Sequence, residues 1–247
     1  MKLSLLKVVS LILVFTALVA VSAFARTNDA VASACDPKVK APDYSLPEWP
    51  EKAQVKVFVV AADFRPEEIA AILTPLSNWS AVAEATGSQV TFVYSGAAAG
   101  PQDCLNCLTI MRGRVHSNGK HAAELQATVI QGEQTILHAR IVIDPVIPNL
   151  TALTNAVAHE LGHNFGLRDC FECHGHSTVM SLIRTSDGFT GPTSCDVAQV
   201  RRVYEHVRMQ AAEAKKHQPQ PQIAKVVPVD VGEDPVDDDT PIVVKKP

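Results

Sequence analysis

The sequence predicts a mixed α/β (α+β) domain, because β-branched alternating segments and segments of helical spacing follow one another along the chain. The clearest strand signal is 54–60, where valine recurs at every second position. The clearest helix signal is the apolar series Val197, Val200, Val203, Tyr204 and Val207, which repeats at the spacing of one helix face.

The remaining elements follow from local composition. Pro66 begins a helix, with Glu67 and Glu68 in its first turn, where the helix dipole favours negative charge. A hairpin turn is expected at 131–134. Further strands are expected at 89–94, 108–115, 124–130 and 135–143, and further helices at about 151–165 and about 193–214, with a long irregular segment between these two helices.

The two ends of the chain differ in composition from its middle. Residues 1–25 resemble a secretory signal peptide, with Lys2 and Lys7 before an apolar run and small residues before an expected cleavage after Ala25. Residues 26–50 are expected to be irregular. The proline- and acid-rich segment 216–247 is expected to be disordered. Residues 51–215 remain for one domain of ordinary size.

Charge argues against several classes of partner. The chain carries a formal net charge of −4, and the loss of Lys2 and Lys7 with the signal peptide makes the mature chain more acidic. Nucleic-acid binding needs clustered basic residues, so no nucleic-acid partner is expected. No membrane contact is expected after signal cleavage, and the sequence does not predict an oligomeric state.

Six cysteines are present in a chain that is expected to be exported. Disulfides are therefore the default, although six cysteines allow 15 connectivities. The two CxxC pairs could instead form a four-thiolate zinc site or be redox-active. The cysteines are Cys35, Cys104, Cys107, Cys170, Cys173 and Cys195.

The segment that indicates chemistry is His159-Glu160-Leu161-Gly162-His163. On a helix, residues four apart share a face, so His159 and His163 can bind one ion. Glu160 lies beside the first of them and can accept a proton from a water activated by Zn²⁺. The expected cofactor is one catalytic Zn²⁺, with Glu160 as general base.

A third ligand is needed, because a catalytic zinc site uses three protein ligands and leaves one position open. Gly166 can end the helix in a left-handed conformation, and the chain can then turn back to present Asp169. His174 and His176 follow shortly after and are alternative third ligands.

This pattern resembles the metzincin metallopeptidases, which carry HExxHxxGxxH followed by a turn that contains methionine. The matching residues are His159-Glu160, His163, Gly166 and Asp169, with Ser177-Thr178-Val179-Met180-Ser181 downstream. The stretch Val157-Ala158-His159-Glu160-Leu161-Gly162-His163 is similar to matrixin sequences. Aspartate at the last position departs from the main pattern and is similar to a minority form in small bacterial metzincins of the snapalysin kind.

The resemblance covers about residues 150–183 and implies several features. Met180 would lie beneath the metal as an apolar floor and would not bind it. A mixed twisted sheet would lie above the active-site helix, and a C-terminal helix would follow the Met-turn. One edge strand of that sheet would bind a protein or peptide substrate in extended form, by β-addition.

Three functions are open at this point. The first is a secreted or periplasmic zinc endopeptidase. The second is an exported zinc-binding domain without catalysis, against which the intact Glu160 argues. The third is a disulfide or structural-zinc protein built on the CxxC pairs, although no thioredoxin-like βαβ pattern surrounds either pair.

Overall fold

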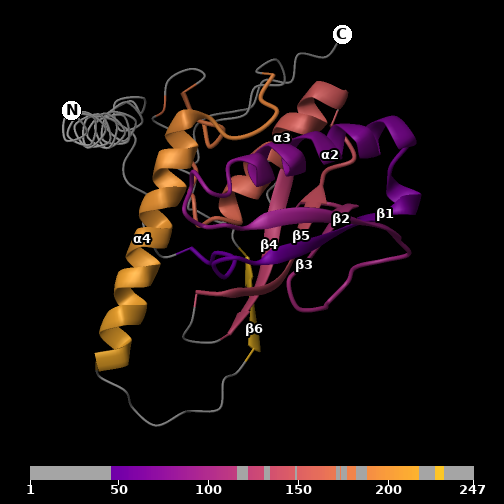
Figure 1. Ribbon diagram of the computed structural model, residues 1–247. Helices are drawn as coiled ribbons and strands as arrows, with labels where there is room; N and C mark the ends of the chain where they lie inside the picture. Colours follow the sequence, from indigo (N-terminus) through magenta and orange to yellow (C-terminus); the bar gives the residue numbers. More distant parts are fainter. Residues whose placement is uncertain are drawn as a thin grey trace, which may run out of the picture.

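The structure is a computed structural model that describes residues 46–115, 122–130, 134–147, 149–170, 173, 177–181, 188–216 and 226–230. Six strands form one sheet in the order β2-β1-β3-β5-β4-β6 (Figure 1). The strands are β1 (Gln54–Val60), β2 (Thr91–Ala98), β3 (Cys107–Arg112), β4 (Ala123–Ile130), β5 (Ile136–Ile143) and β6 (Val226–Asp230).

Strand direction divides the sheet into two parts. β2, β1, β3 and β5 run parallel to one another, while β4 is antiparallel to β5 and β6 is antiparallel to β4. The sheet is therefore mixed, and the α+β fold class predicted from the sequence is confirmed. The antiparallel part lies at one side of the sheet, so β4 would be the edge strand without β6.

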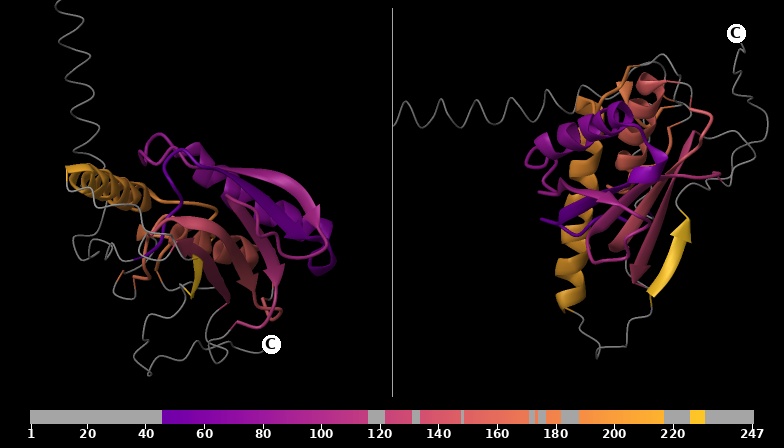
Figure 2. Two further views of the ribbon diagram at one scale, coloured as in Figure 1. Left: turned by 90° about the horizontal axis from the view of Figure 1, so that it is seen from below. Right: turned by 90° about the vertical axis from the view of Figure 1, so that its right-hand side faces the viewer.

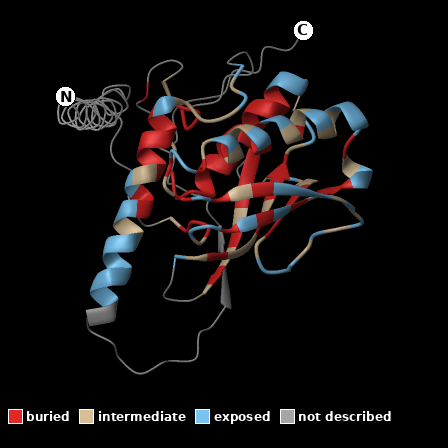
Figure 3. Ribbon diagram, viewed as in Figure 1, coloured by how far each residue is buried: buried red, intermediate tan, exposed pale blue. Residues whose placement is uncertain are grey.

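The helices are α2 (Pro66–Ala81), α3 (Leu150–His163) and α4 (Ser194–Lys216), with the short 3-10 turn η1 (Ala61–Asp63) after β1. α2 and α3 pack against each other over the sheet, and α4 lies along one side of the domain (Figures 1 and 2). The first half of α4 is buried and its C-terminal half is exposed (Figure 3). The apolar side predicted for this helix is confirmed, since Val200, Val203 and Tyr204 belong to the core.

Helix α3 lies in the centre of the domain. Every residue from Ala152 to His163 is buried, which explains why this helix has no polar face in the sequence. Its first turn is capped by Asn149, whose side-chain oxygen accepts a hydrogen bond from the Ala152 N–H at 2.9 Å. A helix that is enclosed on all sides can hold its side chains in fixed positions.

Tryptophan and tyrosine side chains anchor α3 to other elements. Trp79 of α2 donates a hydrogen bond from Nε1 to the Ala158 carbonyl oxygen at 3.0 Å. Trp49 donates from Nε1 to Oδ1 of Asn164 at 2.9 Å, and the Tyr204 hydroxyl of α4 donates to the Trp49 carbonyl oxygen at 2.7 Å. Each buried aromatic ring therefore has its polar atom satisfied while it fixes the helix.

The packed domain begins before residue 51, which corrects the predicted boundary. Trp49 is fully buried, and the Glu48 backbone bonds to the Gln134 carbonyl oxygen and the Ile136 N–H. Prolines at 47 and 50 suggested an irregular segment, and the chain here is indeed not a named strand. Long-range packing, which local composition does not report, makes these residues part of the core.

The C-terminal segment also differs from expectation. Residues 226–230, predicted to lie in a disordered tail, form β6 and pair with β4 from Gln126–Asp230 to Ile130–Val226. Proline is tolerated in a strand at the edge of a sheet, and Pro228 occupies such a strand here. The predicted signal peptide and the rest of the tail lie outside the described residues.

No helix in the described ranges is long and apolar enough to cross a membrane.

We predict that Glu48→Gln removes a pH dependence of stability. Burial raises the pKa of Glu48 from 4.5 to about 8. Its contribution to stability is therefore full below pH 4.5 and is lost as the pH rises toward 8, by at most about 1.4 kcal/mol per pH unit. Urea unfolding between pH 5 and 8 should show that the free energy of unfolding of Glu48→Gln increases relative to the wild type as the pH rises. The exposed control Glu84→Gln should show no such increase. A difference in unfolding free energy between Glu48→Gln and the wild type that does not change with pH would contradict the prediction.

Candidate metal centre

Four predicted site residues meet at the end of α3. Potential ligand atoms of His159, Glu160 and His163 lie within 4.8 Å of one another, and all three residues are buried. Oδ1 of Asp169 is 2.8 Å from Nε2 of His159 and 3.5 Å from Nε2 of His163. The residues that the sequence singled out, ten positions apart along the chain, therefore converge in space.

Backbone carbonyl groups orient both imidazoles. Nδ1 of His159 is 2.9 Å from the Val179 carbonyl oxygen, and Nδ1 of His163 is 2.8 Å from the Leu167 carbonyl oxygen. A carbonyl oxygen only accepts, so each Nδ1 carries the proton. In the neutral rings this leaves the Nε2 lone pairs directed at the same place, which is the arrangement of metal-binding histidines.

The end of α3 brings Asp169 to the histidines. Gly166 has φ +78°, its N–H donates to the His163 carbonyl oxygen, and the Leu167 N–H donates to the Gly162 carbonyl oxygen. This pair of bonds is a Schellman motif, which needs a left-handed residue and favours glycine. The predicted helix stop at Gly166 is confirmed. The reversal that it produces lets the Leu167 carbonyl group reach His163 and Asp169 reach both rings.

The segment around Met180 lies directly under α3. A Cβ atom at Gly162 would overlap the sulfur of Met180, so glycine at this position allows the two segments to approach closely. Met180 is buried, and the Met180 carbonyl oxygen accepts a hydrogen bond from the Cys170 N–H at 2.8 Å. The turn that contains Met180 therefore packs against α3 and is hydrogen-bonded to Cys170, the residue that follows Asp169.

Asp196 is a supporting residue that the sequence analysis missed. Its buried carboxylate accepts hydrogen bonds from the Thr178 hydroxyl, the Val179 N–H at 3.0 Å and the Thr193 N–H at 2.7 Å. It therefore fixes the turn whose Val179 carbonyl orients His159. The spacing Thr193-x-x-Asp196 at the start of α4 has the form of a capping box and could have signalled the cap, but not the contact with the turn.

Burial and neighbouring charges have opposing effects on the pKa values of Glu160 and His159. Burial raises the pKa of the Glu160 carboxyl, the two imidazoles oppose this rise, and Asp169 and Glu124 add to it. Burial lowers the pKa of His159, but the charge and hydrogen bond of Asp169, together with Glu160, raise it to about 9. Glu124, a buried residue of β4, was not singled out by the sequence.

The donor set fits a divalent cation. Two ligand atoms that are each about 2.0–2.1 Å from a tetrahedral ion are roughly 3.4 Å apart, which matches the 3.5 Å between Asp169 and His163. The 2.8 Å between Asp169 and His159 is a hydrogen-bond distance, which would lengthen around a shared ion. Two imidazole nitrogens and one carboxylate oxygen are ligands that zinc accepts. The arrangement can therefore hold one metal ion, with Glu160 beside it.

The cysteines within the described residues form disulfides, as expected. Cys104 pairs with Cys107 and Cys170 pairs with Cys173, with Cα atoms 5.3 Å apart in both pairs. Cys195 is also disulfide-bonded. The four-thiolate zinc site, considered from the sequence, is therefore not formed.

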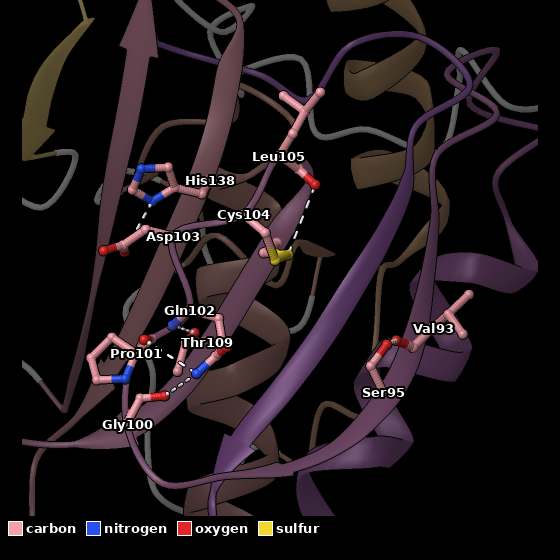
Figure 4. The surroundings of a disulfide bond; sticks show 11 residues. Val93, Ser95, Gly100, Pro101, Gln102, Asp103, Cys104, Leu105, Thr109 and His138 are labelled. Atoms are coloured by element: carbon pink, nitrogen blue, oxygen red, sulfur yellow. Dashed lines mark hydrogen bonds and ion pairs between the residues drawn. A yellow bond between two sulfur atoms is a disulfide. The ribbon is translucent and has the colours of Figure 1, made fainter.

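The two CxxC disulfides have different surroundings. The first lies where the chain enters β3, next to Asp103, whose Oδ1 is 3.6 Å from Nδ1 of His138 (Figure 4). The second follows Asp169 directly, and the Cys173 N–H donates to the Cys170 carbonyl oxygen. Only the second can stiffen the chain that presents Asp169.

Three of the candidate site residues named from the sequence lie outside the described residues. They are Cys35 and the alternative ligands His174 and His176. Comparison with known proteins adds no assignment, since no protein-family profile matches the chain and no curated protein matches it.

We predict that Gly162→Ala destabilises the protein and that Met180→Ala relieves the effect. Alanine favours a helix interior by about 1 kcal/mol over glycine, but the added Cβ would overlap the Met180 sulfur. Overpacking of this kind costs about 1–3 kcal/mol. Thermal unfolding of both single variants and the double variant should show that Gly162→Ala is tolerated better when Met180 is alanine. If Gly162→Ala lowers the stability by the same amount in the wild type and in Met180→Ala, overlap with the Met180 sulfur is not the cause of the destabilisation.

Proposed function

We propose that this protein is a zinc-dependent endopeptidase. The observation that supports this most strongly is the convergence of two imidazole nitrogens and the Asp169 carboxylate beside the buried carboxyl of Glu160. His159, His163 and Asp169 would hold the ion. Zinc bound there would polarise a peptide carbonyl group as a Lewis acid and make a water molecule more acidic.

Glu160 has the position and environment of a general base. It follows His159 on the same buried helix turn, and its pKa is raised by burial, despite the two imidazoles. A base is most effective when its pKa lies near the working pH. Glu160 would accept the proton of the attacking water and then deliver it to the nitrogen of the leaving amine, which completes peptide hydrolysis.

β4 supports a peptide as the substrate. Without β6 this strand would be the edge of the sheet, and α3 packs against β4 and β5. An extended peptide can add to such an edge through backbone hydrogen bonds, which recognise a polypeptide whatever its sequence. Because α3 packs against β4, a peptide added to this edge would run beside the helix that carries the proposed general base.

Export fits the same proposal. Disulfides persist in oxidising compartments, and Cys104–Cys107 and Cys170–Cys173 are both formed. Together with the signal-like sequence of residues 1–25, they favour a secreted or periplasmic enzyme.

Glu160→Ala should abolish hydrolysis and leave zinc bound. Loss of a general base lowers the rate by about 10²–10⁴-fold or more, while the three proposed ligands stay in place. Casein hydrolysis by the purified mature protein, with zinc measured in the same samples, checks both parts. Glu84→Ala, an exposed control, should keep full activity. Unchanged cleavage by Glu160→Ala would remove Glu160 from the mechanism, and an inactive, zinc-loaded wild type would favour the non-catalytic zinc-binding alternative.

The third ligand can be tested by two substitutions at one position. Asp169→Ala should weaken zinc binding by at least about 10–100-fold, because a ligand is lost. Asp169→His should bind zinc more tightly than Asp169→Ala, since imidazole is also a zinc ligand. Competition against a chromogenic chelator measures both affinities. Full affinity in Asp169→Ala, with loss in His174→Ala or His176→Ala, would reassign the ligand.

A further inference from the structure

The outer edge of β4 is occupied by a segment of the same chain. β6 pairs antiparallel with β4 over five residues, in the register Gln126–Asp230, Ala127–Val229, Thr128–Pro228, Val129–Val227 and Ile130–Val226. Figures 1 and 2 show β6 beside β4, away from β1 and β2. The edge to which a peptide would add by β-addition is therefore already paired along its second half.

The strand that β6 covers also packs against the helix that carries Glu160. Asp230, the last residue of β6, pairs with Gln126, whereas Val226 pairs with Ile130, the last residue of β4. Gln126 donates a hydrogen bond from Nε2 to Oε1 of the buried Glu124 at 2.8 Å. Because α3 packs against β4, a strand on the outer edge of β4 lies on the same part of the sheet as the proposed general base.

We infer that residues 226–230 compete with an extended peptide for the outer edge of β4, and so restrain access to the metal centre. The inference rests on the proposed function for its effect on hydrolysis, but the competition itself concerns only strand pairing. A bound peptide and β6 need the same backbone N–H and C=O groups of β4, so the two cannot pair with residues 126–130 together.

Tethering makes a short competitor effective. An isolated five-residue strand binds an edge weakly, but a segment of the same chain is present at an effective concentration in the millimolar range. Only residues 217–225 separate α4 from β6.

The test uses the full mature chain with Val227→Pro and Val229→Pro together. Both substitutions remove backbone donors within β6 and should release it from β4. The matched control is Val243→Pro with Val244→Pro, the same change in the same tail but outside β6. In a Glu160→Ala background, which prevents cleavage, fluorescence anisotropy would measure the binding of a labelled peptide that copies residues 224–232.

The released variant should bind this peptide about tenfold more tightly than the parent and the control, because the tethered competitor is gone. With Glu160 intact, its KM for a peptide substrate should fall by a similar factor while kcat is unchanged. Hydrogen exchange in 123–130, followed by mass spectrometry, should be slow in the parent and faster in the released variant, which reports on β6 directly.

The outcomes separate this inference from the proposed function. Equal peptide affinity in all three proteins, or exchange in 123–130 that the substitutions leave unchanged, would overturn the inference even if the protein is an active protease. Tighter peptide binding by the released variant, with no hydrolysis by any Glu160-containing protein, would support the competition for β4 and refute the endopeptidase.

Discussion

Two imidazoles and a carboxylate can meet at one point only if the helix that carries the imidazoles cannot rotate and the chain reverses at once when that helix ends. α3 satisfies the first condition, because every residue from Ala152 to His163 is buried. Gly166 satisfies the second, because its left-handed backbone closes the Schellman motif. The rest of the domain can be understood as the support for these two conditions.

That support comes from segments far apart in sequence. Trp79 fixes α3 from α2, and Trp49 fixes the Asn164 side chain while Tyr204 of α4 bonds to the Trp49 backbone. Asp196 holds the turn that orients His159. A buried polar network of this kind is stabilising only when each group has its partner, so a change at its periphery would alter the candidate metal centre through the orientation of a ring.

The sequence predicted those parts that local rules govern. Strand alternation, helix spacing and the glycine stop located β1, α3 and Gly166, and the histidine spacing placed His159 and His163 on one face. Contacts between remote segments had no local signal. Gly162 within a helix could have indicated a close approach, but not that Met180 makes it.

The composition of the acidic, proline-containing tail predicts disorder when the tail is considered alone. Within it, residues 226–230 form β6 by pairing with the edge of β4. This dependence on a partner strand gives the tail its proposed influence on the metal centre. A segment that is ordered only by pairing with β4 can also be displaced from it, whereas the strands of the central sheet are fixed by the core on which α2 and α3 pack.

We propose that His159, His163 and Asp169 bind one zinc ion. X-ray absorption at the zinc edge of the purified mature protein, with its zinc content determined, would reveal the ligands of that ion. We expect one zinc per chain, with nitrogen and oxygen neighbours at about 2.0–2.2 Å and no sulfur neighbour. A protein that folds without zinc and does not take it up, or a zinc ion with sulfur neighbours at about 2.3 Å, would contradict it.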